Sequence, residues 1–445
     1  MRSVLSIVLV SALLAGCSDG GGPSASTDAG SGGGGGGASS GGGDGGGADE
    51  GGGGDGGSGG EDAGGGGGGG GGAPPGECAG GSTEEANTDP DDPVQQAVDH
   101  LVRDDRFPAV LAAVSDLDGQ TRHYIAGVAD LETGAKVPVD GQVRIGSNSK
   151  PFTAVVVLQL VGEGKVELDA PIETYLPGLV RGEGIDGHGI TVRQILQQNS
   201  GLPDFVNELF SGGFAEIRHA YFDPRTLLDL ALAQEVRFPP GDRWEYSNTN
   251  YIVAGLLVER VTGRPLAEEI TRRVIDRIGL RHTYVPRVGD ESIRECHPRG
   301  YHADSFGEPL YDVTELDPSM AGASGNMIST PGDLNRFFTA LLGGELLEPA
   351  QLAEMRATID ASSMWPGTEY GLGLSSIPLS CGGLAWGHGG DIFGYETAGG
   401  VTDDGRAVTV AVTALPSALP GVETREQAYA AYADVLALVD TALCE

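Results

Sequence analysis

Three short motifs bring together the residue types that acyl transfer to a serine requires. In chain order they are Ser147-Asn148-Ser149-Lys150, Tyr246-Ser247-Asn248 and His388-Gly389-Gly390. A serine hydroxyl is a weak nucleophile at neutral pH, so a neighbouring base must take its proton as it attacks a carbonyl carbon. Lys150 and Tyr246 are the candidate bases.

The spacing of the first motif has a physical reason. Residues three apart on a helix lie on one face, so Lys150 can contact Ser147. Gly146 precedes the serine and an apolar run from 152 to 160 follows it, which predicts that Ser147 lies at the start of a buried helix. Free backbone N–H groups and the helix dipole favour negative charge at that point. Pro151 fits this placement, because proline is tolerated in the first helical turn.

Lysine is rare in this chain, since the only lysines are Lys136, Lys150 and Lys165. An arginine would stay protonated, whereas a buried lysine can lose its proton and act as a base. An isolated Ser-x-x-Lys is more often a solvated stretch of helix than a catalytic motif. The surrounding sequence is therefore needed to decide between the two.

That surrounding sequence resembles the serine beta-lactamase and D-alanyl-D-alanine carboxypeptidase superfamily, on the branch of class C beta-lactamases and related serine hydrolases, over roughly residues 91–443. Four blocks carry the resemblance in family order: residues 144–154 around Ser147, residues 190–203 ending in Asn-Ser-Gly-Leu-Pro, residues 240–251 around Tyr246, and residues 322–337. The resemblance implies an α+β fold, with an antiparallel sheet flanked by terminal helices, a mainly helical lobe, and the active site between them.

The resemblance also implies roles for individual residues. Ser147 would be the acylated nucleophile, Lys150 its hydrogen-bonded partner and Tyr246 the phenol that passes a proton to the leaving group. Asn248 would bind the amide carbonyl of the substrate. The oxyanion hole would consist of the backbone N–H groups of Ser147 and Asp391.

The third motif departs from the commonest family pattern, which has Lys or His, then Thr or Ser, then Gly. His388 and Gly390 are the substrate-binding positions that match, whereas Gly389 lacks the hydroxyl that helps to hold a substrate carboxylate. The missing hydroxyl therefore favours neutral esters and amides as substrates.

The sequence does not decide whether Lys150 or Tyr246 is the general base. The ordinary pKa of a tyrosine is about 10, so Tyr246 could act as a base only beside cations at Lys150 and His388. Because an ordinary histidine titrates near ~6.5, activity that relies on a protonated His388 is expected to fall as pH rises through its pKa.

The N-terminal region predicts export. Residues 1–17 resemble a bacterial lipoprotein signal peptide, with a short apolar run and a lipobox, Leu14-Ala-Gly-Cys17, that would make Cys17 the lipidated residue. The alternative is an ordinary secretory signal. Residues 18–77 are glycine-rich and predict a disordered tether, and residues 78–445 a single hydrolase domain. We expect the protein to be anchored to the bacterial cell envelope by lipid.

Four cysteines remain beyond the lipobox, which in an exported chain favours two disulfides over metal or redox chemistry. Three pairings are possible, and the preferred one joins Cys78 to Cys444 and Cys296 to Cys381. We expect no metal site and no cofactor.

The formal net charge of −36 argues against nucleic acid as a partner and against electrostatic docking on an anionic membrane. Membrane contact would then come only through the N-terminal lipid. The expected partner is a small-molecule or peptide substrate, cell-wall peptide included.

Three functions are compatible with the sequence. The leading hypothesis is an exported serine hydrolase that acts through an acyl-enzyme on a D-amino-acid peptide or a beta-lactam-like amide. The second is an esterase on the same machinery. The third is a surface lipoprotein that keeps the fold only for binding.

Overall fold

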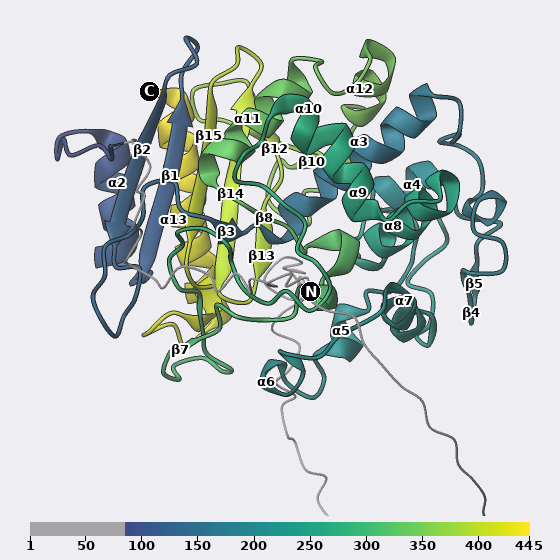
Figure 1. Cartoon of the computed structure of the whole chain (residues 1–445), viewed down its shortest axis with the longest axis horizontal. Helices are drawn as coiled ribbons and strands as arrows, with labels where there is room; N and C mark the ends of the chain where they lie inside the picture. Colours follow the sequence, from purple (N-terminus) through teal and green to yellow (C-terminus); the bar gives the residue numbers. More distant parts are fainter. Residues whose placement is uncertain (1–84) are drawn as a thin grey trace, which may run out of the picture. The chain divides into compact units, whose positions relative to one another are not determined.

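The computed structural model describes residues 85–445 (Figure 1). The predicted signal peptide with Cys17, the predicted tether 18–77 and Cys78 lie outside these residues. Within residues 85–445 no helix is both long and apolar enough to cross a membrane.

A nine-stranded antiparallel sheet forms the centre of the described region. Its order is β2-β1-β15-β14-β12-β11-β10-β9, and β13 pairs with β14. The strands are β1 (Ala109–Ser115), β2 (Thr121–Gly127), β9 (Ile359–Asp360), β10 (Glu369–Tyr370), β11 (Ser375–Pro378), β12 (Leu384–Gly387), β13 (Gly390–Ile392), β14 (Tyr395–Thr402) and β15 (Ala407–Val412). β1 and β15 are apolar except for Ser115 and Thr409, as is typical of strands covered on both faces.

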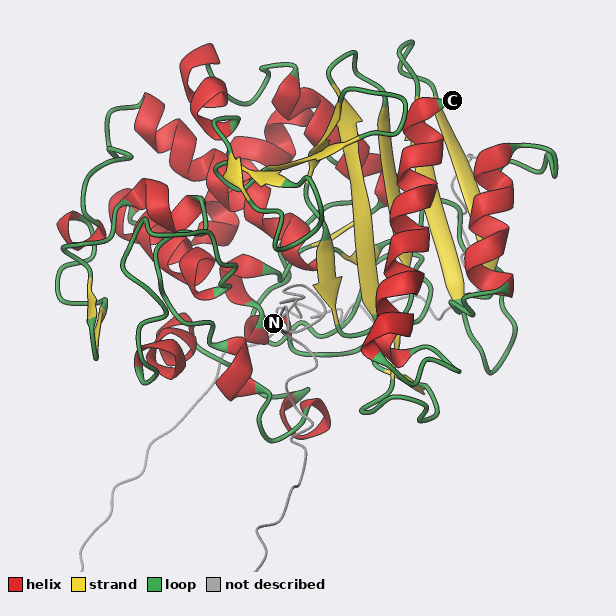
Figure 2. Ribbon diagram, turned by 180° about the vertical axis from the view of Figure 1, so that it is seen from behind, coloured by secondary structure: helices red, strands yellow, loops and turns green. Residues whose placement is uncertain are grey.

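The first and last helices cover one face of the sheet (Figure 2). These are α2 (Pro93–Arg103) and α13 (Arg425–Cys444), which pack against each other and against the sheet. Val98 of α2 and Val435 of α13 share one core cluster with Val110 and Val410 of the central strands. Chain regions more than 300 residues apart therefore form one layer.

The opposite face is covered by α11 (Pro331–Leu342), beyond which the helical lobe begins. Phe152 of α3 (Ser149–Gly162) stacks on Phe337 of α11 with ring centroids 3.7 Å apart. The other helices are α4 (Val192–Leu196), α5 (Val206–Leu209), α6 (Phe214–Ile217), α7 (Pro224–Leu232), α8 (Thr249–Thr262), α9 (Leu266–Ile270), α10 (Asp276–Ile278) and α12 (Pro349–Met355). Three two-stranded ladders lie outside the main sheet: β3 (Val143–Arg144) with β8 (Ile328–Ser329), β4 (Arg181–Gly182) with β5 (Ile185–Asp186), and β6 (Tyr301–His302) with β7 (Tyr311–Asp312). The predicted α+β architecture is confirmed.

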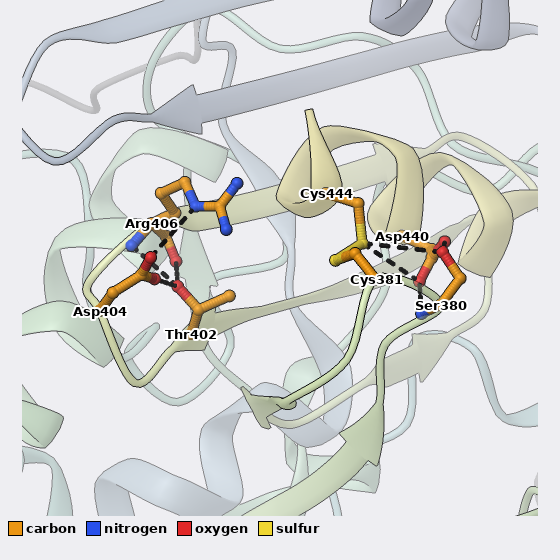
Figure 3. The surroundings of a disulfide bond; sticks show 7 residues. All are labelled: Ser380, Cys381, Thr402, Asp404, Arg406, Asp440 and Cys444. Atoms are coloured by element: carbon orange, nitrogen blue, oxygen red, sulfur yellow. Dashed lines mark hydrogen bonds and ion pairs between the residues drawn. A yellow bond between two sulfur atoms is a disulfide. The ribbon is translucent and has the colours of Figure 1, made fainter.

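The predicted disulfide pairing is wrong. Cys381, in the turn between β11 and β12, is bonded to Cys444 at the end of α13, with the two Cα atoms 5.6 Å apart (Figure 3). This bond excludes both Cys78–Cys444 and Cys296–Cys381. The neighbouring Ser380 amide donates to Asp440 Oδ1 at 2.8 Å, so the same turn is also fixed to α13 by a hydrogen bond. The sequence alone does not show that α13 runs back alongside this turn.

Candidate active site

The nucleophile motif lies at the junction of a short 3₁₀ turn, Gly146–Asn148, and the buried helix α3. Gly146 has φ +46°, and a Cβ atom there would lie 2.7–2.8 Å from the backbone of Asp391. Only glycine fits this close approach. The turn places Ser147 at a helix start, where backbone N–H groups lack helical partners, as the sequence predicts.

Lys150 is the second residue of α3 and is fully buried. Its Nζ atom is 2.8 Å from Ser147 Oγ, 2.7 Å from Asn248 Oδ1 and 2.8 Å from the Ser324 carbonyl oxygen. Burial lowers the pKa of Lys150 to about 7, although the nearby carboxyl groups oppose this shift. A substantial fraction of this amine is therefore neutral at physiological pH and able to accept the serine proton.

Tyr246 lies beside this pair, with its ring centroid 4.8 Å from Lys150 Nζ. The phenol oxygen is buried and has no hydrogen-bond partner among the described residues. Burial raises its pKa well above the ordinary value, and the proximity of Ser147 offsets this only in part. The opposite directions of these two pKa shifts favour Lys150 as the base and Tyr246 as a proton donor.

Asn248 links Lys150 to Asp204, a carboxylate that the motif analysis did not single out. The Asn248 side-chain amide accepts from Lys150 and donates to Asp204 Oδ2 at 2.9 Å. Asp204 directly follows the Asn-Ser-Gly-Leu-Pro block, and this position in the sequence was the signal that could have identified it. A substrate carbonyl could bind the Asn248 amide only by replacing this hydrogen bond.

His388 is buried in a hydrogen-bonded position and is not a cation. Its Nε2 atom is 3.0 Å from the Tyr370 hydroxyl, and its Nδ1 atom is in hydrogen-bond contact with the Gly389 carbonyl. Burial, and next the charge on Lys150, lower the pKa of His388 to about 3. The expectation of a protonated imidazole beside Tyr246, with activity lost as it titrates near neutral pH, therefore does not hold.

The hairpin β13–β14 presents the backbone of Asp391 to the nucleophile. Ile392 and Tyr395 are paired and close a two-residue turn. The next pair along the hairpin, Asp391 and Glu396, is therefore of the non-hydrogen-bonded type, so the Asp391 N–H points away from β14. That free edge packs on the turn that holds Ser147. The geometry is compatible with the predicted pair of oxyanion donors.

Gly390 makes this packing possible. A Cβ atom on Gly390 would lie 2.0 Å from the Ile145 carbonyl oxygen, whereas one on Gly389 would meet nothing closer than 3.6 Å. Gly390 is thus sterically required and Gly389 is not. Asn148 Nδ2 also donates to Thr397 Oγ1 on β14 at 2.8 Å, which ties the two segments together.

A cavity of about 80 Å³ opens onto these groups. Most of its wall is apolar, and among its described lining residues only Asp391 has an ionisable acidic or basic side chain other than the Tyr246 phenol. The lining consists of Ser147, Phe205, Val206, Phe210, Tyr246, Asn248, Met320, Ala321, Ser324, Gly325, Asp391, Ile392 and Phe393.

Comparison with solved structures finds this fold in enzymes that act on amides. A D-stereospecific amidohydrolase from Streptomyces sp. is 38% identical, with a TM-score of 0.68 over 76% of this chain and 97% of that one. The D-amino acid amidase of Ochrobactrum anthropi SV3, in complex with L-phenylalanine amide, is 27% identical, with a TM-score of 0.67 over 78% of this chain and 98% of that one.

Curated relatives add an esterase and a penicillin-binding protein. Esterase EstB of Burkholderia gladioli is 32% identical over 342 residues, which is 67% of this chain and 84% of the esterase. Penicillin-binding protein 4* of Bacillus subtilis (strain 168) is 25% identical over 288 residues, which is 62% of this chain and only 61% of that protein's length.

Fold and site together define the class as a serine hydrolase. The family model described as Beta-lactamase matches residues 94–434, and the chain belongs to that family.

The pKa of Lys150 predicts the pH dependence of the reaction. A base whose pKa is about 7 is protonated and inactive below that pH, so kcat/KM is expected to rise with pH. The rise should be roughly tenfold between one unit below and one unit above the inflection. In the His388→Gln variant the inflection is expected to stay in place. A wild-type profile that falls across this range would contradict the assignment of Lys150 as the base.

The two glycines of the third motif form a matched pair for mutation. Gly390→Ala forces β13 away from the turn that holds Ser147 and is expected to lower kcat by on the order of 100-fold, as loss of one oxyanion donor does. Gly389→Ala has room and serves as the control. Equal kinetics for both variants, with folding checked by circular dichroism, would show that Gly390 does not set the oxyanion geometry.

Proposed function

We propose that this chain hydrolyses amides of D-amino acids with apolar side chains, through an acyl-enzyme on Ser147. The observation that carries the proposal is the cavity at Ser147, with an apolar wall and no cationic side chain among its described lining residues. A penicillin or a peptide C-terminus brings a carboxylate, which would be desolvated there without a positive partner. Gly389 offers no hydroxyl to it, and the pKa of His388 keeps that imidazole uncharged.

The proposed reaction uses the groups in sequence. Neutral Lys150 takes the proton of Ser147 as Oγ attacks the carbonyl carbon, and the N–H groups of Ser147 and Asp391 hold the oxyanion. Tyr246 gives its proton to the leaving amine as the C–N bond breaks, and recovers a proton from Lys150. A water molecule then attacks the acyl-enzyme by the same steps in reverse and releases the acid.

The similarity to a D-stereospecific amidohydrolase over nearly all of that protein's length supports an amide with D configuration. A second candidate is ester hydrolysis on the same machinery, favoured by the 32% identity to an esterase. Without a proton donor an ester can expel an alkoxide, whereas an amide would have to expel a much more basic amide anion, so the ester reaction depends less on the proton that Tyr246 supplies.

The test compares four compounds on wild type and Ser147→Ala: the amides of D- and L-phenylalanine, p-nitrophenyl acetate and benzylpenicillin. Ammonia release is expected from the D-amide at a rate well above that from the L-amide, and intact-protein mass spectrometry is expected to show no stable penicillin adduct. Ester turnover without amide turnover would favour the second candidate. Rapid acylation by penicillin, absent in Ser147→Ala, would refute the exclusion of carboxylates.

We also propose that the protein is exported and lipid-anchored through Cys17. The lipobox Leu14-Ala-Gly-Cys17 supports this, as does the Cys381–Cys444 disulfide, because such bonds persist in oxidising compartments. Cells expressing the chain are expected to incorporate radiolabelled palmitate into it, and the Cys17→Ala variant to lose the label. Unlabelled wild-type protein in the soluble fraction would contradict the anchor.

A further inference from the structure

Asp204 is connected to the catalytic amine through a single side-chain amide. Its Oδ2 atom accepts a hydrogen bond from Asn248 Nδ2 at 2.9 Å, and Asn248 Oδ1 accepts one from Lys150 Nζ at 2.7 Å. Lys150 Nζ in turn lies 2.8 Å from Ser147 Oγ. Four side chains from three separate segments of the sequence therefore form one hydrogen-bonded row that ends at the nucleophile.

The two neighbours of Asn248 agree on which way its amide faces. A side-chain amide offers an acceptor oxygen on one side and a donor NH2 group on the other. The ammonium form of Lys150 requires the oxygen, and the Asp204 carboxylate, which has no proton to donate, requires the NH2 group. If the amide turned over, like would face like at both contacts, so each neighbour opposes the turn.

Asp204 is itself held in place by other groups of the helical lobe. Its Oδ1 atom accepts from the Val206 N–H at 3.2 Å, at the start of α5, and its carbonyl oxygen accepts from Gln234 Nε2, just after α7, at 3.2 Å. The two carboxylate oxygens therefore have different partners. Oδ1 shapes the local turn, whereas Oδ2 is directed to Asn248.

The carboxyl group of Asp204 also acts on Lys150 by its charge. Burial raises the pKa of Asp204, while hydrogen bonds from Val206 and Asn248 and the charge on Lys150 oppose that shift. The charge of Asp204 raises the pKa of Lys150, against the larger lowering by burial. Hydrogen bonding and charge thus act on the same amine.

The other titratable groups with an electrostatic or ring contact to Lys150 are Asp391, His388, Tyr246 and Tyr251. Asp391 raises the pKa of Lys150 as well, whereas the pKa of His388 keeps that imidazole neutral. Burial raises the pKa of both phenols well above the ordinary value. Of these groups and Asp204, it is Asp204 that the described hydrogen bonds connect to Lys150 through another side chain.

We propose that Asp204 is a positioning residue, which fixes the Asn248 amide and through it holds Lys150 against Ser147. This inference rests on the role of Lys150 in the proposed function, but not on which amide or ester is the substrate. Asp204 acts through Asn248 and needs no contact with the reacting atoms.

Because the chain has only three lysines, the amine can be observed directly. In protein labelled with ¹³C at lysine Cε, NMR of wild type is expected to show one resonance that titrates with a midpoint near the Lys150 pKa of about 7 and is missing in Lys150→Met. Asp204→Asn keeps an Oδ1 acceptor for the Val206 N–H but removes the charge and the second acceptor. Its midpoint is expected at lower pH, because the ammonium form loses a nearby negative charge and a fixed acceptor. An unchanged midpoint would overturn the proposal.

Asp223→Asn is the matched control. Asp223 is exposed at the N-terminus of α7, and its Oδ1 atom accepts from the N–H of Arg225 at 2.8 Å, two positions along the chain, as Asp204 Oδ1 does from Val206. The control removes the same charge from the same kind of turn. Its Lys150 midpoint is expected to equal that of wild type, and a shift as large as in Asp204→Asn would overturn the proposal.

Turnover of p-nitrophenyl acetate adds a kinetic measurement that does not depend on a D-amino acid amide. Asp204→Asn is expected to lose about 10- to 100-fold in the high-pH plateau of kcat/KM, with the inflection displaced to lower pH as in the NMR titration. A plateau equal to that of wild type would overturn the proposal. If the D-amide is not hydrolysed while the NMR midpoint still shifts, the proposed function fails and the role of Asp204 stands.

Discussion

The site depends on one buried amine and the three oxygen atoms around it. Removing an ammonium group from water is costly, and the cost appears as the lowered pKa of Lys150. The hydrogen bonds to Ser147, Asn248 and the Ser324 carbonyl hold the amine in place in either protonation state. Each partner belongs to a different segment of the chain, so the nucleophile can be activated only when the helical lobe is folded correctly.

The turn that precedes Lys150 packs closely, backbone against backbone, on the sheet. The turn that holds Ser147 and the strand that follows His388 approach so closely that neither Gly146 nor Gly390 can carry a side chain. His388 is held beside that approach by its hydrogen bonds to Tyr370 and to the Gly389 carbonyl. In this arrangement His388 positions the backbone and contributes no charge. A lysine at the same position of the family pattern would contribute a positive charge.

The sequence was sufficient where local pattern determines structure. The apolar run after Gly146 predicted the buried helix α3, and the spacing of Ser147 and Lys150 predicted their contact. It was insufficient where the answer depends on what surrounds a group in space. Nothing near His388 in the chain shows that burial removes its charge, and nothing near Cys444 shows that the β11–β12 turn is its neighbour.

Electrostatics then decides which carbonyl compounds suit this site. The shared fold supports penicillin-binding, esterase and amidase activities in different relatives, so fold alone cannot select among them. Here Lys150 is occupied by protein acceptors, His388 is neutral, and the acidic side chains of Asp204 and Asp391 lie within electrostatic range of Lys150. A substrate carboxylate would bring a negative charge that no cationic side chain among the described lining residues of the cavity neutralises. The same buried machinery can therefore retain its acyl chemistry while the charge of its surroundings changes the preferred substrate.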